Sequence, residues 1–208
     1  MSSYVMHMCI SNVIKEKLKL TDKFIYGSIL PDIIKNITGD RRKTHYLETV
    51  VIDRETKNLP HIDRAIKELN IQDKEIRLGY IAHLIEDLIW FRDYVPTYAK
   101  EVSPNEIYYL CDGKIHDAKE FTQDMYLDYY NSSAYVENIC NTNMEMLKES
   151  LSNIIEDEEH IKKMLENTRY FEGADIKANK FMTKHSIDKY IKQSAEEVEK
   201  IVLELIGE

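Results

Sequence analysis

One segment, residues 74–93 with the sequence KEIRLGYIAHLIEDLIWFRD, constrains the fold of this chain more than any other. Its apolar residues surround a helix almost completely, which is typical of a helix buried at the centre of a bundle. These residues are Leu78, Ile81, Ala82, Ile85, Leu88, Ile89 and Trp90. Asp73 is a suitable N-cap and Pro96 ends the helix. Glycine and proline are rare, with 6 and 4 copies in 208 residues, so turns are few and helices are favoured.

Amphipathic patterns predict further helices, about seven in all. They cover residues 6–18, 60–69, 133–155, 158–165 and 186–206. We expect a turn at Leu30-Pro31, and we expect GDRRKTHY at 39–46 to be a loop that leads into a new helix. The sequence therefore predicts an all-α protein, a single multi-helix bundle over residues 1–208. The candidate metal-site motifs lie in 1–125, and 126–208 adds further helices.

Charge and cysteine usage narrow the partners and the compartment. The net charge of −9 works against binding to a nucleic-acid backbone, so nucleic acid is expected only as a substrate. The three cysteines show no CxxC spacing, which excludes a thiolate zinc site and favours a reducing compartment. The first residues lack a secretory pattern, and no apolar run reaches the roughly 20 residues of a membrane span. We expect a cytoplasmic protein without a transmembrane segment.

Two polar residues interrupt the apolar helix. His83 and Asp87 are four residues apart, so both side chains emerge on one face, one turn above the other. Burying an imidazole and a carboxylate costs free energy unless a partner satisfies them. The pattern leaves two interpretations open: a hydrogen-bonded His–Asp pair, or a metal site.

Other histidines and carboxylates along the chain are further candidate metal ligands. His116 and Glu120 in IHDAKEF repeat the spacing, and two such pairs on adjacent helices can face each other across a bundle. Taken alone, this second pair is also typical of a solvated helix face. His7 lies in the first apolar helix, while Asp32 in LPD and His45 in KTHY lie near helix ends. Imidazoles and carboxylates without thiolates suit zinc with open positions for water.

The order of these motifs resembles the zinc-dependent phospholipase C family, an all-α fold related to the fungal single-strand nucleases. The resemblance covers roughly the first 120 residues. It implies one to three zinc ions. The implied ligands are Asp32, His45, His83 and Asp87 at a primary site, His7 at a neighbouring zinc, and His116 with Glu120 at a further one. The family's additional histidine after the central helix has no counterpart, and Asp93 or Asp112 is a candidate replacement.

The resemblance also implies an activity. It predicts a zinc-dependent hydrolase that cleaves a phosphodiester with a metal-activated water, with Asp32 as the catalytic residue. The expected substrate is a small phosphoester or a phospholipid.

Two other interpretations remain. His116-Asp117 is an HD dipeptide with His83 upstream and Asp124 or Asp128 downstream, which is the pattern of an HD-type metal phosphohydrolase. Alternatively, the chain is a non-catalytic helical interaction protein that retains the fold.

Overall fold

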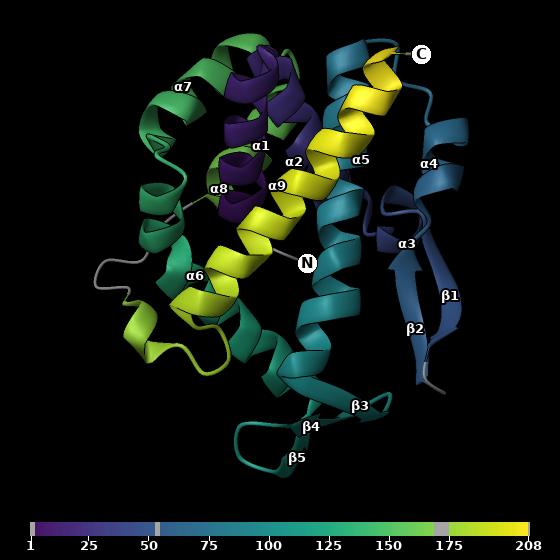
Figure 1. Ribbon diagram of the computed structural model, residues 1–208, viewed down its shortest axis with the longest axis vertical. Helices are drawn as coiled ribbons and strands as arrows, with labels where there is room; N and C mark the ends of the chain where they lie inside the picture. The colour runs from purple at the N-terminus through teal and green to yellow at the C-terminus, as the bar shows by residue number, and fades with distance from the viewer. Residues whose placement is uncertain (1–2, 53–54, 169–174, 208) are drawn as a thin grey trace.

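The computed structural model describes residues 3–52, 55–168 and 175–207 (Figure 1). Within these residues the helices are α1 Tyr4–Leu18, α2 Asp22–Thr38, α3 Arg41–Thr44, α4 Ile62–Glu68, α5 Lys74–Ile89, α6 Ala118–Ile139, α7 Met144–Ile154, α8 Glu158–Asn167 and α9 Lys184–Gly207. The strands are β1 Leu47–Ile52, β2 Glu55–Pro60, β3 Ala99–Ser103, β4 Glu106–Tyr109 and β5 Lys114–Asp117. The predicted all-α class is confirmed, and the strands form only two small antiparallel sheets.

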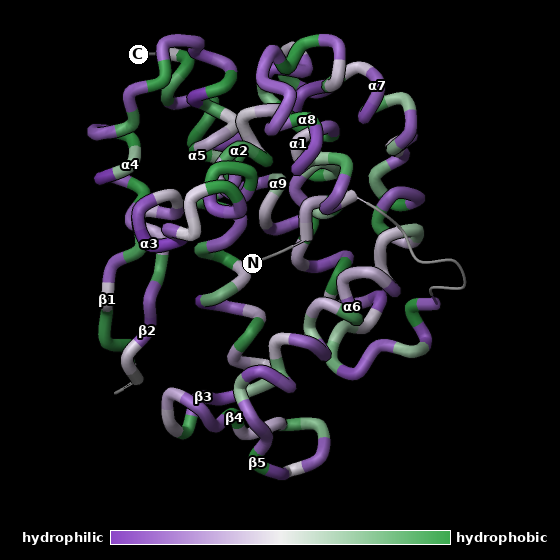
Figure 2. Tube along the Cα trace, turned by 180° about the vertical axis from the view of Figure 1, so that it is seen from behind, coloured by the Kyte–Doolittle hydropathy of each residue, from purple (hydrophilic) through white to green (hydrophobic). Residues whose placement is uncertain are grey.

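Helix α5 lies at the centre of the bundle, as its apolar sequence predicts. It packs against α2 and α9, while α1 lies against both α2 and α9 (Figure 1). Asp73 caps its N-terminus by accepting hydrogen bonds from the backbone N–H groups of Glu75 and Ile76. After Ile89 the chain continues as a π-helical turn, Trp90–Tyr94. In Figure 2 the hydrophobic segments gather where α1, α2, α5 and α9 lie together.

Two glycines allow α2 and α5 to approach each other closely. A Cβ atom on Gly79 would lie 1.9 Å from the backbone oxygen of Phe24, and one on Gly27 would lie 2.2 Å from that of Ile76. Because backbone atoms cannot move aside as flexible side chains do, any other residue would push the helices apart. This close contact brings the polar residues of α2 and α5 together.

Replacing Gly79 by alanine is expected to lower the free energy of unfolding by about 3 kcal/mol, because the helix pair must separate. Urea denaturation followed by circular dichroism measures the loss. Gly207→Ala is the matched control, since a Cβ at Gly207 meets nothing within 4 Å. Equal stability of the two variants would contradict the close contact.

The expected turn at Leu30-Pro31 is wrong, because α2 continues through Pro31. Proline has no N–H to donate to the carbonyl four residues earlier, which costs a helix about 3 kcal/mol. The packing of α2 along α5 outweighs this cost. The carbonyl of Ser28 follows the one that Pro31 leaves without a helical donor, and it accepts a hydrogen bond from His83 of α5.

The helix expected after KTHY is also wrong, since the chain enters the β1–β2 hairpin instead. Residues 49–52 are Thr-Val-Val-Ile, a β-branched run that favours a strand over a helix. The β3–β4–β5 sheet at 99–117 was likewise not predicted.

The helix expected over residues 133–155 is two helices. α6 ends at Ile139 and α7 begins at Met144. Asn141 between them has a φ of 49°, a left-handed conformation that ends a helix, and Asn143 caps α7 by accepting from the backbone of Met146. The predicted helices at 60–69, 158–165 and 186–206 are confirmed as α4, α8 and α9, with small shifts of their ends.

Across the residues that the structure describes, no helix has the length and apolar character to cross a membrane.

Candidate metal centre

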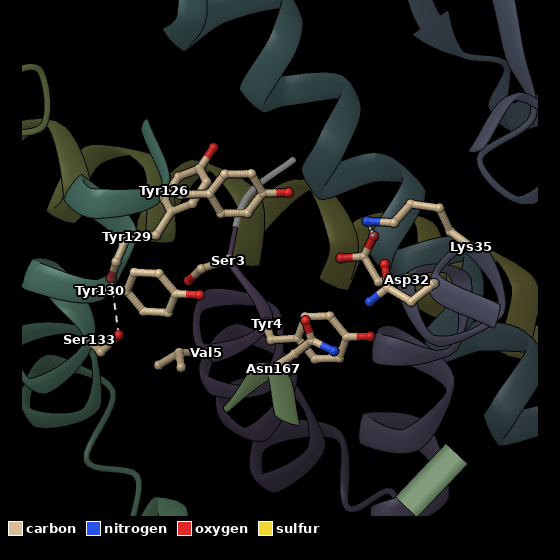
Figure 3. A pocket seen from close by; sticks show the side chains of 11 residues that line it. Ser3, Tyr4, Val5, Asp32, Lys35, Tyr126, Tyr129, Tyr130, Ser133 and Asn167 are labelled. Carbon is tan, nitrogen blue, oxygen red and sulfur yellow. Dashed lines mark hydrogen bonds and ion pairs between the residues drawn. The ribbon is translucent and has the colours of Figure 1, made fainter. Parts of the chain in front are cut away.

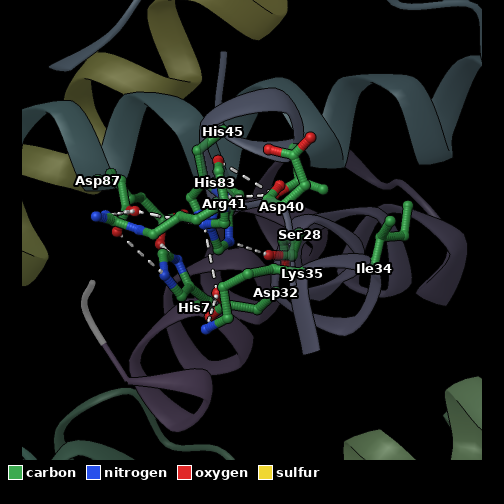
Figure 4. Close-up of polar contacts among 12 residues, drawn as sticks. His7, Ser28, Asp32, Ile34, Lys35, Asp40, Arg41, His45, His83 and Asp87 are labelled. Carbon is green, nitrogen blue, oxygen red and sulfur yellow. Dashed lines mark hydrogen bonds and ion pairs between the residues drawn. The ribbon is translucent and has the colours of Figure 1, made fainter. Parts of the chain in front are cut away.

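Three histidines and three carboxylates meet in the interior, where the N-terminal half of the bundle is most tightly packed (Figure 4). They come from α1, α2, the turn after α3, and α5. All six side chains are buried: His7, Asp32, His45, His83, Glu86 and Asp87. His83 and Asp87 therefore lie together with three other expected ligands, His7, Asp32 and His45. Glu86, which was not predicted, completes the cluster.

Hydrogen bonds fix the orientation of two imidazole rings. Nδ1 of His83 lies 2.7 Å from the carbonyl oxygen of Ser28, which can only accept, so this nitrogen carries the proton. Nδ1 of His45 lies 2.9 Å from the hydroxyl oxygen of Thr44. That hydroxyl donates to the carbonyls of Asp40 and Arg41, so it accepts from His45. In the neutral form of each ring the lone pair is therefore on Nε2.

These two lone pairs face the same point. The Nε2 atoms of His45 and His83 are 3.2 Å apart, and Asp32 Oδ1 lies 3.3 Å from His45 Nε2. Two unprotonated nitrogens at this distance repel each other unless a cation lies between them. Zinc–ligand bonds of about 2.0–2.1 Å give tetrahedral ligands a separation of roughly 3.3 Å, which matches both distances. Asp87 Oδ2 completes the set at 3.7 Å from His45 Nε2 and 3.9 Å from His83 Nε2.

A second group of ligands adjoins the first. The ligand atoms of His7, His83 and Asp87 lie within 4.8 Å of one another, as do those of Asp32, His45 and His83. His83 belongs to both groups, but it has only one lone pair, so it can bind a single ion. Asp87 has an oxygen for each side: Oδ1 lies 3.7 Å from His7 Nε2, and Oδ2 lies near His45. Asp87 is thus placed to bridge two ions.

Glu86 holds His7 in place. Its Oε2 lies 2.6 Å from His7 Nδ1, so one proton is shared between the two atoms and Nε2 of the ring is turned toward Asp87. A carboxylate behind a histidine in this way is common at metal sites. Oε1 of Glu86 is buried without a hydrogen-bond partner among the described residues. Burial and the adjacent Asp87 raise the pKa of Glu86 well above its ordinary value, which favours a proton on the Glu86–His7 pair.

The pKa shifts of the buried histidines and aspartates also favour a bound cation. Burial lowers the pKa of His83 to about 4, and burial together with His83 holds the pKa of His7 well below its ordinary value. Both rings are therefore neutral at pH 7. Burial opposes ionisation of Asp32 and Asp87, yet the pKa of each carboxyl lies below its ordinary value; at Asp32 the hydrogen bond with His45 and the charge of His83 lower it. The cluster thus concentrates negative charge in the interior, which a bound dication would neutralise.

Two cations lie at the edge of this cluster (Figure 4). Lys35 Nζ is 3.1 Å from Asp32 Oδ1, and a guanidinium nitrogen of Arg41 is 3.7 Å from Asp87 Oδ2. The Arg41 guanidinium also lies over the ring of Phe91, 4.9 Å from its centroid. One basic residue therefore approaches each of the two aspartates.

The turn that carries His45 is braced from several sides. Asp40 caps the short helix α3 by accepting from the backbone of Lys43. The hydroxyl of Tyr80 on α5 donates to the backbone oxygen of Thr44 at 2.5 Å. Tyr46, the next residue after His45, has a φ of 49°, which is a strained conformation for a residue with a Cβ. The strain marks the point where the chain turns His45 inward before β1 begins.

The second predicted pair, His116 and Glu120, lies elsewhere. His116 is in strand β5 rather than in a helix, and Glu120 is in the first turn of α6. The ring of His116 contacts Asp112 Oδ2 at 2.8 Å and Glu120 Oε1 at 3.1 Å, and it stacks on Tyr109. Neither of the two ligand groups found among the described residues contains this pair. Its role as a zinc site stays a prediction.

The other acidic candidates have structural partners. Asp93 pairs with Arg92 and accepts a hydrogen bond from Gln193. Asp117 is the N-cap of α6, Asp124 binds Lys180, and Asp128 accepts three backbone N–H groups from 180–182. Neither metal-ligand group within the described chain includes a residue of the HD dipeptide.

Glu86 is the residue of this cluster that sequence reasoning missed. A signal was present, because Glu86 adjoins Asp87 on a helix with apolar residues on almost every side. A carboxylate on such a helix needs a partner as much as His83 and Asp87 do. The identity of that partner, His7 at a sequence separation of 79, could come only from the fold.

Comparison with known proteins agrees with this geometry. The family model described as "Zinc dependent phospholipase C" matches residues 6–202, nearly the whole chain. The searches among curated proteins and among solved structures gave no match. The matched residues include all six members of the buried cluster. The chain therefore belongs to the zinc-dependent phospholipase C family.

Proposed function

We propose that this protein is a zinc-dependent hydrolase of phosphodiester bonds, with a primary zinc held by Asp32, His45, His83 and Asp87. The observation that carries the proposal is the 3.2 Å separation of two lone-pair nitrogens, on His45 and His83, beside two ionised aspartates. His7, positioned by Glu86, is proposed to contribute with Asp87 to a second zinc site. Zinc is favoured over harder cations because the donors are imidazoles and carboxylates together.

When bound, zinc would supply a Lewis acid that polarises phosphate oxygens and lowers the pKa of a nearby water. Asp32 is proposed as the catalytic residue. It combines a position in the ligand set with a place in the lining of a pocket that reaches the buried cluster. Its carboxylate is therefore placed to orient the attacking water and to accept its proton. Arg41, whose guanidinium lies 3.7 Å from Asp87 Oδ2, would stabilise the negative charge that develops on the phosphoryl oxygens.

The substrate is proposed to reach the site from outside through two pockets. One is lined by Asp32, Lys35 and several tyrosines. The other lies between the β1–β2 hairpin and β3, and Arg41 is part of its wall. Arg41 connects this second pocket to the cluster, because its guanidinium nitrogen lies 3.7 Å from Asp87 Oδ2. We keep both a small phosphodiester and a phospholipid as substrates, and the cytoplasm as the compartment.

The test combines metal content with hydrolysis. Purified protein is stripped with a chelator, reloaded with zinc and analysed by atomic emission spectroscopy. It is then assayed with bis-p-nitrophenyl phosphate, p-nitrophenylphosphorylcholine and single-stranded DNA. We expect one or two zinc ions per chain and hydrolysis of at least one diester that stops on chelation. Stoichiometric zinc with no hydrolysis would favour the non-catalytic interpretation, and no bound metal would exclude the proposal.

A further inference from the structure

The pocket that ends at Asp32 is lined mainly by neutral polar and aromatic side chains (Figure 3). Its cavity volume is about 70 Å³, which is enough for a group of a few heavy atoms. Three tyrosines of α6, Tyr126, Tyr129 and Tyr130, form one wall, and Asp32 with Lys35 of α2 lies opposite. Ser3, Tyr4, Val5, Asn36, Ser133 and Asn167 complete the lining.

The wall offers many hydrogen-bond donors and little negative charge. Burial raises the pKa of Tyr126 and Tyr129, so their hydroxyl groups keep their protons and can donate. Among the lining residues that the structure describes, Asp32 is the single carboxylate and Lys35 the single cation. The serine and asparagine side chains are neutral donors as well.

The balance of charge changes when a metal is bound. Lys35 Nζ and Asp32 Oδ1 form an ion pair at 3.1 Å, and the lysine side chain is only 15% exposed. A zinc ion held by Asp32 would share the charge of this carboxylate. The pocket then carries the positive charge of Lys35 next to the reacting phosphate. A quaternary ammonium group would be repelled there despite the aromatic rings, because a cage for such a group must not contain a cation of its own.

We propose that this pocket binds an anionic group of the substrate, a carboxylate or a second phosphate, with Lys35 as its counterion and the tyrosine hydroxyls as donors. The inference rests on the proposed function, which puts the scissile phosphodiester beside Asp32. It defines the substrate class: a diester whose non-leaving substituent is negatively charged. Such a group can belong to a lipid headgroup or to a water-soluble ester.

Binding measurements test the pocket independently of turnover. The probes are three phosphomonoesters of similar size, 2-phosphoglycolate with a carboxylate, ethylene glycol phosphate with a neutral hydroxyl, and phosphorylcholine with a cation. Titration calorimetry on the zinc-loaded protein is expected to give about tenfold tighter binding of 2-phosphoglycolate than of phosphorylcholine. Lys35→Met should remove most of this preference, and Lys35→Arg should keep it.

The control is Lys23→Met on the same helix, since Lys23 pairs with Asp73 and is no part of the pocket lining. It should bind all three probes as the wild type does. Tighter binding of phosphorylcholine by the wild type would overturn the proposal. So would an equal loss for all three probes in Lys35→Met, because Lys35 would then act only through Asp32.

Turnover distinguishes the two sources of the anionic group. The p-nitrophenyl diesters of glycolate, ethylene glycol and choline represent soluble substrates, and dihexanoyl lipids with the same three headgroups represent lipids. We expect the glycolate member to have the highest kcat/KM in at least one series. Lys35→Met should raise the KM of this substrate and leave its kcat nearly unchanged. The series with faster turnover identifies the source. No turnover in either series would count against the proposed function, while the binding result still decides the pocket.

Discussion

Replacing His83 by alanine is expected to lower zinc affinity by at least about 100-fold, the upper range for losing a group behind a ligand rather than the ligand itself. His83 is part of both ligand groups, and its Nδ1 proton is fixed by the carbonyl of Ser28 so that Nε2 faces His45. Its loss therefore removes one of the four proposed donors of the primary zinc. Competition with a chromogenic chelator measures the affinity, and circular dichroism shows whether the helices are retained.

His45→Ala provides a second test, because His45 contributes to the primary group alone. We expect it to remove the primary zinc as well. His7→Ala should reduce the stoichiometry while the primary zinc remains. The matched control is His160→Ala on helix α8, which should leave the zinc content unchanged, because the ring of His160 contacts Tyr26 and belongs to neither ligand group found among the described residues. Loss of zinc in His116→Ala with full binding in His45→Ala would favour an HD-type site.

Asp32→Asn is expected to lower kcat by about 10²- to 10⁴-fold, the range for losing a general base. Asparagine keeps the size of the side chain and one oxygen that can face the metal, but it cannot accept a proton from water. Zinc is supplied in excess and its content measured, so that loss of metal is separated from loss of catalysis. Steady-state kinetics with the best diester of the activity screen give kcat.

Asp112→Asn is the control for this experiment, because Asp112 contacts His116 on the three-stranded sheet and belongs to neither ligand group found in the described part of the chain. It should retain wild-type kcat. A zinc-loaded Asp32→Asn protein with nearly normal kcat would assign the proton transfer to another group. Asp32 would then contribute to zinc binding and not to proton transfer.

The helices were predictable where one face or the whole circumference is apolar. The segment 74–93 was expected at the centre, and α5 lies there. Prediction failed where local preference and tertiary packing disagree. Pro31 favours a break, yet α2 passes through it because Gly27 and Gly79 let two helix backbones touch over their length. The strands were missed because segments of only four to six residues give no clear periodicity, even where the residue types favour a strand, as in β1.

The expected ligands divide according to burial. His7, Asp32, His45, His83 and Asp87 are all buried in one cluster. His116 and Glu120 had the same spacing as His83 and Asp87, but spacing reports only which residues share a helix face. It does not report whether that face is covered, and in this chain His116 is not in a helix at all. That residues 1–208 form a single domain stays a prediction.

The sequence by itself determined the helical class, the central position of α5 and the residue types of the metal centre, because hydrophobic periodicity and ligand chemistry are local properties. Only the tertiary structure decided which of those residues meet. The pairing of His7 with Glu86, the facing Nε2 atoms of His45 and His83, and the place of Lys35 beside Asp32 all join separate elements. These contacts depend on how closely the helices approach, and that distance is set by packing rather than by any one segment.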